Sequence, residues 1–115
     1  MFVANVKDME KLEMNGPGIN NAFKQVLIGP EQGWQDYVMR LITLRSNGNS
    51  PKHQHPWPHI NFIVSGNGIL YMNGQEYPIK AGSIAYVPNN IEHQYINTST
   101  EDLSFICIVP KEGEK

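Results

Sequence analysis

The residues best suited to chemistry are the histidines, which gather in two short segments. His53, His55 and His59 lie within seven residues of one another, and His93 follows alone. Imidazole nitrogens bind first-row divalent metals at about 2.0–2.2 Å. Four neutral imidazoles add no charge, so a bound cation would keep its +2 charge and polarise any molecule at its open positions. The pattern predicts a metal centre held by these side chains.

The spacing within the first segment suggests how three of these imidazoles meet. Residues two apart on a strand point to one face, so His53 and His55 can aim at a common point. Pro56-Trp57-Pro58 separates them from His59. Because proline cannot donate to a β-ladder, we expect a bulge here that tilts His59 toward the first two. His93 is expected to come from another strand.

The elements that must position these side chains are short and extended. Runs of β-branched and aromatic residues alternate with Gly, Pro and Asn clusters, and Asn73-Gly74 has the chemistry of a type I′ hairpin turn. The spacing predicts an all-β sandwich or closed barrel. The expected strands are 23–28, 37–45, 60–64, 69–72, 76–79, 83–87, 94–96 and 103–109.

Composition narrows the class of protein. A chain of 115 residues fits one domain, and its net charge of −2 argues against a nucleic-acid partner. The single cysteine, Cys107, excludes an internal disulfide, as expected in a reducing cytoplasm. Residues 1–10 carry charges that interrupt any signal-peptide core, and no apolar run approaches the roughly 18 residues of a membrane span. We therefore expect a cytoplasmic protein with no membrane partner.

The two histidine segments resemble the two sequence motifs of the cupin family. The first motif is matched by His53-Gln54-His55, His59 and Gly66, and the second by Gly82, Pro88, His93 and Asn97. The resemblance implies a cupin barrel, which is a double-stranded β-helix or jelly roll, and a likeness to small stand-alone bacterial cupins that commonly dimerise.

Two positions depart from the family pattern. His59 replaces the usual Glu of the first motif, which implies a four-histidine site in place of three His and one Glu. Asn90 stands where the second motif has Gly, and Asn is the residue that best tolerates positive φ after Gly.

The expected organisation has three parts. Residues 1–22 form an arm with a short strand near Phe2–Val6 or a helical turn near Asp8–Met14, and the arm is available to pair with a partner subunit. Residues 23–110 form the barrel, and 111–115 a frayed polar tail. The resemblance, together with outward-facing apolar residues such as Phe62 and Ile108, predicts a homodimer.

The same alternation predicts which residues share the pocket. On each strand, every second residue after His59 and His93 should face inward, and the family resemblance orients the last strand. The expected pocket residues are Asn61, Ile63, Tyr95, Phe105 and Cys107.

Two further residues border the expected pocket. Arg40 lies among apolar neighbours and either holds an anionic substrate group or makes an edge salt bridge, which is the favoured reading. Trp57 is expected to cap the barrel rim, where it could gate entry, or to form a dimer contact. Cys107 is expected to be a small buried hydrophobic residue and not a ligand.

The absence of inward-facing Asp or Glu near the histidines disfavours a paired-carboxylate mechanism, so chemistry is expected to run on the metal. The leading hypothesis is a metal-dependent oxidoreductase of dioxygenase type acting on a small organic substrate. The cofactor is one divalent transition metal: Mn, Fe, Cu, Ni or Zn. One alternative is a non-oxidative isomerase or lyase on a sugar or keto acid, with Tyr95 transferring the proton. The other is a small-molecule-binding cupin without catalysis.

Overall fold

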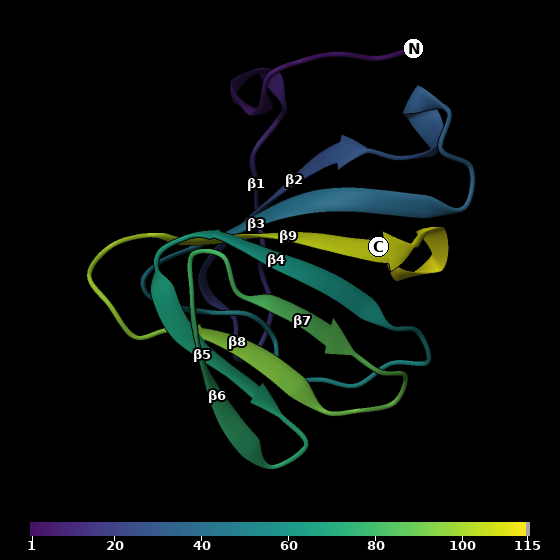
Figure 1. The fold of residues 1–115 in the computed structure, drawn as a ribbon. Helices are drawn as coiled ribbons and strands as arrows, with labels where there is room; N and C mark the ends of the chain where they lie inside the picture. Colours follow the sequence, from purple (N-terminus) through teal and green to yellow (C-terminus); the bar gives the residue numbers. More distant parts are fainter. Residues whose placement is uncertain (115) are drawn as a thin grey trace.

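The structure, a computed structural model, describes residues 1–114, which form an all-β fold with three one-turn 3-10 helices (Figure 1). No helix among these residues has the length and apolar character to cross a membrane. The helices are η1 (Val6–Asp8), η2 (Pro30–Gln32) and η3 (Lys111–Gly113). The strands are β1 (Leu12–Glu13), β2 (Asn20–Ile28), β3 (Tyr37–Asn49), β4 (His59–Ser65), β5 (Asn67–Met72), β6 (Gln75–Lys80), β7 (Ile84–Val87), β8 (His93–Asn97) and β9 (Leu103–Pro110).

The strands form one antiparallel sheet that curls on itself, in the order β6-β5-β8-β3-β9-β4-β7 (Figure 1). β3 pairs along most of its length with β9, from Tyr37 to Leu44, and reaches β8 only at its end, where Asn49 lies opposite Ile96. β2 adds to the free side of β3, and β1 adds to β2. The long β3 therefore joins two halves of the curled sheet, and the predicted jelly-roll architecture is confirmed.

Alternation of side chains separates a buried inner face from a more exposed outer face. On β4, His59, Asn61 and Ile63 are buried, whereas Ile60 and Phe62 are exposed. β9 follows the same rule, since its first residue and every second residue after it are buried. The inner faces of these strands hold the core and carry the candidate site.

Turns that need left-handed backbone occur where the sequence predicts them. Asn73 and Gly74 both have positive φ, 51° and 84°, as a type I′ hairpin requires. Asn90 has φ 61°, so this asparagine adopts the conformation expected at the glycine of the second motif. At Gly66, with φ 91°, a side chain would collide with the carbonyl oxygen of Asp102, so the close approach of two backbones also demands glycine.

The arm differs in detail from the prediction. In place of a strand at Phe2–Val6 or a turn at Asp8–Met14, the 3-10 helix η1 begins after Asn5, whose side chain accepts a hydrogen bond from the Lys7 amide. β1 then pairs with β2 of the same chain, and Met14 packs against the core. β1 is thus paired within its own subunit, and pairing of the rest of the arm with a partner subunit stays a prediction. The division at residue 22 stays a prediction, with β2 beginning at Asn20.

The expectation of a frayed C-terminal tail is wrong for residues 111–114, and Lys115 lies outside the described residues. η3 continues directly from β9, and the Glu114 carboxylate accepts hydrogen bonds from Lys24 Nζ at 2.7 Å and Arg40 Nη1 at 3.3 Å. Two cations on different strands thus hold the tail against the barrel.

The outer face of β4 and β7 carries an apolar surface. Neighbouring strands place these side chains in pairs, with Tyr86 opposite Ile60 and Ile84 opposite Phe62. These side chains are well exposed, with Ile84 at 80% and Tyr86 at 59%. We call this surface, defined by Ile60, Phe62, Ile84 and Tyr86, the outer apolar face.

Candidate metal centre

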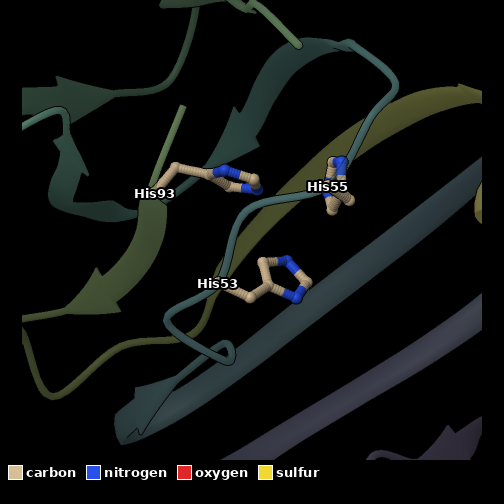
Figure 2. Close-up of side chains that lie close together, drawn as sticks. All are labelled: His53, His55 and His93. Carbon is tan, nitrogen blue, oxygen red and sulfur yellow. The ribbon is translucent and has the colours of Figure 1, made fainter. Parts of the chain in front are cut away.

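Three imidazoles form a compact cluster beside the inner face of the sheet. The candidate ligand nitrogens of His53, His55 and His93 all lie within 4.8 Å of one another. Figure 2 shows two of these rings carried by the loop between β3 and β4, and the third by β8. The spacing places each nitrogen within reach of one shared cation.

The expectation that His53 and His55 lie on a strand is wrong. Both lie in the irregular segment between Asn49 and His59, in which prolines at three positions remove backbone donors. A single antiparallel bridge fixes His53 in place of a ladder: its N–H donates to the His93 carbonyl at 3.1 Å, and the His93 N–H donates back at 2.9 Å. The backbones of two cluster members are therefore joined directly.

Backbone carbonyls orient two of the rings. His55 Nδ1 lies 2.9 Å from the Trp57 carbonyl oxygen, and His93 Nδ1 lies 2.8 Å from that of Ile91. Because a carbonyl oxygen only accepts, both Nδ1 atoms carry the hydrogen and both Nε2 atoms carry a lone pair. His93 Nε2 is buried and has no partner among the described residues. Metal-binding histidines commonly have one ring nitrogen hydrogen-bonded to a carbonyl in this way, which leaves the other nitrogen free for the metal.

His59 reaches the cluster from the first position of β4. Its Nε2 atom lies 2.8 Å from His55 Nε2, and its Nδ1 atom lies 3.3 Å from Cys107 Sγ. Its ring centroid lies 4.5 Å from that of His55 and 4.9 Å from that of His93. The structure thus brings all four predicted histidines together, with His59 placed by a strand and not by a bulge.

The environment keeps the imidazoles neutral. Burial, followed by the charges of His93 and Arg40, lowers the pKa of His59 to about 2. Burial is also the first cause of the lowered pKa values of His53, His55 and His93. Since only a neutral imidazole offers a lone pair, the cluster is ready for a cation at neutral pH.

A cavity of about 60 Å³ is lined by three of the histidines, His53, His59 and His93, together with other residues of β3, β8 and β9 and of neighbouring loops. Of the predicted pocket residues, Arg40, Tyr95, Phe105 and Cys107 line it. Burial of Tyr95, followed by its proximity to Cys107, raises the pKa of its hydroxyl, whose oxygen is buried with no partner among the described residues.

The other predicted pocket residues lie elsewhere. Asn61 and Ile63 are buried on the inner face of β4, where Asn61 Nδ2 donates to the Ile106 carbonyl at 3.3 Å, and they do not line this cavity. Met14, Ile42, Ser50 and Pro51 line the cavity without having been predicted. Of these four residues, only Ile42 could have been predicted from the sequence. It lies two residues after Arg40 on the same strand, so its side chain shares the face of Arg40.

Arg40 makes an ion pair and also lines the cavity, whereas its role in holding an anionic substrate group stays a prediction. It lies directly opposite Cys107 in the β3–β9 register, and its Nη2 donates to Cys107 Sγ at 2.9 Å. Its Nη1 donates to Glu114 at 3.3 Å, so it makes an ion pair while also lining the cavity. The pairing carboxylate comes from the C-terminal turn and not from the neighbouring strands.

Trp57 lies between the C-terminal turn and the imidazole cluster. Its ring stacks on His55, with centroids 4.6 Å apart and planes 12° from parallel. A Cβ atom at Gly113 would lie 2.6 Å from the indole nitrogen of Trp57, so glycine allows η3 to approach this closely. Trp57 thus supports the His55 ring from outside the cavity.

Comparisons with known proteins agree with this geometry. A family model described as "Cupin_2: Cupin domain" matches residues 40–109. The chain is 27% identical over 119 residues to auxin-binding protein 1 of Arabidopsis thaliana, covering 96% of this chain and 59% of the relative. It is 33% identical over 58 residues to an oxalate-binding protein of Thermotoga maritima, covering 50% and 47% of the two chains. The chain therefore spans only about half of the length of these curated relatives.

Solved structures with low sequence identity to this chain share its fold. The polyketide cyclase RemF of Streptomyces resistomycificus superposes with a TM-score of 0.89 over 96% of this chain and 79% of the cyclase, at 20% identity. Such a likeness concerns the barrel alone. With the family match spanning both histidine segments, the chain belongs to the cupin family.

Proposed function

We propose that the protein binds one divalent transition metal through His53, His55 and His93, with His59 as the fourth ligand. The observation that carries this proposal is the cluster of candidate ligand nitrogens of His53, His55 and His93, which all lie within 4.8 Å of one another. The Nε2 atoms of His55 and His59 lie 2.8 Å apart. When the Nδ1 hydrogen of His59 points to Cys107, these two lone pairs face each other, and a shared cation removes their repulsion. Two imidazoles bound at right angles to one ion at about 2.1 Å have nitrogens about 3 Å apart.

The bound metal would supply Lewis-acid or oxygen-activating chemistry to a small organic molecule. The chain's own residues would bind and shield that molecule. Arg40 offers a positive charge, Tyr95 a hydroxyl donor, and Phe105 and Ile42 an apolar wall. No described residue that lines the cavity is a carboxylate, so general acid–base work by Asp or Glu is not available there. We therefore place the chemistry on the metal and keep an oxidoreductase of dioxygenase type as the first hypothesis.

The relatives support a second candidate function without oxygen chemistry. Two of them are named for binding auxin and oxalate, and the structural neighbour is named a cyclase. A non-oxidative isomerase or lyase, or a small-molecule-binding cupin without catalysis, would use the same site. The cavity of about 60 Å³ admits only a small molecule or one end of a larger one.

Metal analysis is the decisive experiment. We expect the full chain, purified without added metal, to contain close to one transition-metal ion per subunit by mass spectrometry. His93→Ala should lose most of it, because that side chain presents a free lone pair to the cluster. Gln94→Ala is the matched control, since the Gln94 side chain bonds the Ser50 carbonyl outside the cluster. Equal metal content in both variants would overturn the proposal.

An oxygen electrode then separates the two candidate functions. Oxygen uptake that depends on both the metal and a small unsaturated substrate would support the dioxygenase. Turnover of a sugar or keto acid under anaerobic conditions would instead identify an isomerase or lyase.

We also propose that the protein forms a homodimer through the outer apolar face. Exposed apolar sheet surface of this kind is typical of subunit interfaces.

The free thiol of Cys107, which is buried, agrees with a reducing cytoplasm, and the cytoplasmic location stays a prediction.

A further inference from the structure

A chain of polar contacts runs through the barrel interior from Arg40 to the backbone at Trp57. Arg40 Nη2 lies 2.9 Å from Cys107 Sγ, which lies 3.3 Å from His59 Nδ1. His59 Nε2 in turn lies 2.8 Å from His55 Nε2, and His55 Nδ1 lies 2.9 Å from the Trp57 carbonyl oxygen. Each contact needs one hydrogen and one lone pair, so the positions of the hydrogens depend on one another.

Both ends of this chain are groups that play only one role. A guanidinium only donates, so the Arg40 contact makes Cys107 Sγ an acceptor. A carbonyl oxygen only accepts, so His55 carries its hydrogen on Nδ1 and presents a lone pair at Nε2. Without a cation, the hydrogen of the neutral His59 ring must therefore lie on Nε2, where it donates to His55. His59 Nδ1 then carries a lone pair, and the S–H of Cys107 donates to it.

Binding of a cation through His59 Nε2 would reverse the middle of the chain. An imidazole nitrogen that binds a metal must carry a lone pair, so the single hydrogen of His59 must then lie on Nδ1. The ring releases a proton from Nε2 and accepts one at Nδ1, which leaves its own charge unchanged. The Nδ1–H now points to Cys107, whose sulfur must accept where the thiol donated before. A thiol can play both roles, whereas an aliphatic side chain of similar size can play neither.

We propose that Cys107 is a positioning residue for the metal site: it donates to His59 Nδ1 in the metal-free protein and accepts from it once a cation is bound. The inference rests on the proposed function, because it concerns His59 as the fourth ligand. It assigns Cys107 a polar role beyond that of a small buried hydrophobic residue. Arg40 holds the sulfur in place, since it lies opposite Cys107 in the β3–β9 register and is itself buried.

Burial makes the hydrogen bond between Cys107 and His59 important for metal affinity. Cys107 is 1% exposed and His59 8%, so water has little access to replace a lost partner. A ring that shares a lone pair with a cation is a stronger donor, and charge-assisted hydrogen bonds are roughly twice as strong as neutral ones. Loss of the sulfur should therefore cost the metal-bound state more than the metal-free state. Outer partners of ligating histidines typically contribute about 10–100-fold to metal affinity.

Nitrogen NMR of the full-length ¹⁵N-labelled protein reads the position of each imidazole hydrogen directly. Metal is removed with 1,10-phenanthroline, and zinc is used for loading because its filled d shell leaves the spectra sharp. We expect His59 to show the Nε2–H form without zinc and the Nδ1–H form with zinc, while His55 keeps its hydrogen on Nδ1 in both states. The Nδ1–H form of His59 without zinc, or its Nε2–H form when zinc is bound, would overturn the proposal.

Two substitutions of similar size separate hydrogen bonding from packing. Cys107→Val neither donates nor accepts, and in competition titrations with a zinc indicator it should bind zinc about tenfold more weakly. Cys107→Ser keeps both roles and should stay within about threefold of the parent affinity. A purely apolar role predicts the reverse order, because valine is the better tolerated residue in a buried apolar site. Ile106→Val is the matched control, on the opposite face of the same strand, and should change nothing. Cys107→Ala takes the place of the valine variant if the latter does not fold.

Spectra of the metal-free variants separate this inference from the proposed function. In Cys107→Val, the His59 Nδ1 resonance should move toward that of a nitrogen without a hydrogen-bond donor, and this shift does not depend on zinc. If zinc fails to bind the parent protein but the shift occurs, the proposed function is wrong and Cys107 still places the His59 hydrogen. If zinc binds the parent and Cys107→Val equally well, or the His59 resonances of the two proteins agree, the inference is refuted and the metal site stands.

Discussion

The Nε2 atoms of His55 and His59 lie 2.8 Å apart, although one residue belongs to an irregular loop and the other to a strand. The Trp57 carbonyl fixes the hydrogen of His55 on Nδ1, so His55 Nε2 is an acceptor. The contact therefore needs either a hydrogen on His59 Nε2 or a cation between the rings. The relationship makes His59 the most informative position in the cluster.

Removing the His59 ring tests its role as a ligand. His59→Ala should weaken metal binding at least about tenfold, because one of four donors is lost. Ile60→Ala is the control, since the Ile60 side chain lies on the opposite face of β4 and is exposed. Competition titrations with a zinc indicator measure both. An unchanged zinc affinity in His59→Ala would show that the site uses three histidines.

The lowered histidine pKa values predict a loss of stability in acid. A histidine has a pKa near 6.5 when unfolded, whereas His59 has a pKa of about 2 in the folded protein, so below pH 6.5 the unfolded state binds more protons. The free energy of unfolding should therefore be highest above pH 6.5 and fall as the pH decreases. His59 alone should remove about 2 kcal/mol by pH 5.

Urea unfolding of the metal-free protein at pH 7.5, 6 and 5 measures this effect. His59→Gln, which cannot titrate, should show a shallower dependence than the parent protein. A free energy of unfolding that stays constant between pH 7.5 and 5 would contradict the assignment of neutral, buried imidazoles.

The contact between Gly113 and Trp57 gives a test remote from the ligands. A methyl group at position 113 would lie 2.6 Å from the Trp57 indole nitrogen, so Gly113→Ala must displace the ring that stacks on His55. We expect a shifted Trp57 indole N–H resonance and a severalfold weaker metal affinity. Lys111→Ala, an exposed position on the same turn, should leave both unchanged. Wild-type values in Gly113→Ala would mean that Trp57 does not support His55.

The outer apolar face makes the oligomeric state testable. The parent chain should sediment at micromolar concentration as a species of twice 13.0 kDa. Phe62→Asp and Ile84→Lys should give monomers, because they place charge in the centre of the proposed interface. Tyr77→Lys is the control, on β6 outside that face. A parent protein that sediments only at 13.0 kDa would rule out the dimer.

The sequence predicted most of what depends on local alternation. The period of two placed His59, Asn61 and Ile63 on the buried face of β4, and the turn chemistry located Asn73-Gly74 and Asn90. Such features follow from neighbouring residues. They need no knowledge of where distant segments meet.

The parts that could not be predicted depend on contacts between segments far apart in the chain. His53 is placed by a bridge to His93, 40 positions later, and proline removes the local pattern that would have announced it. The C-terminal turn was expected to be frayed, since the local sequence does not show that the Glu114 carboxylate pairs with Arg40. That partner is a strand residue 74 positions earlier. A one-dimensional pattern carries no trace of such long-range pairings.

The anchoring of Glu114 also bears on how the protein should be produced. A polyhistidine tag fused near this side chain, which contacts Lys24 and Arg40, would add rival imidazoles close to Gly113 and the Trp57 ring that stacks on His55. Purification handles therefore belong next to Met1, which is fully exposed, so that the measured metal content reports the barrel and not the handle.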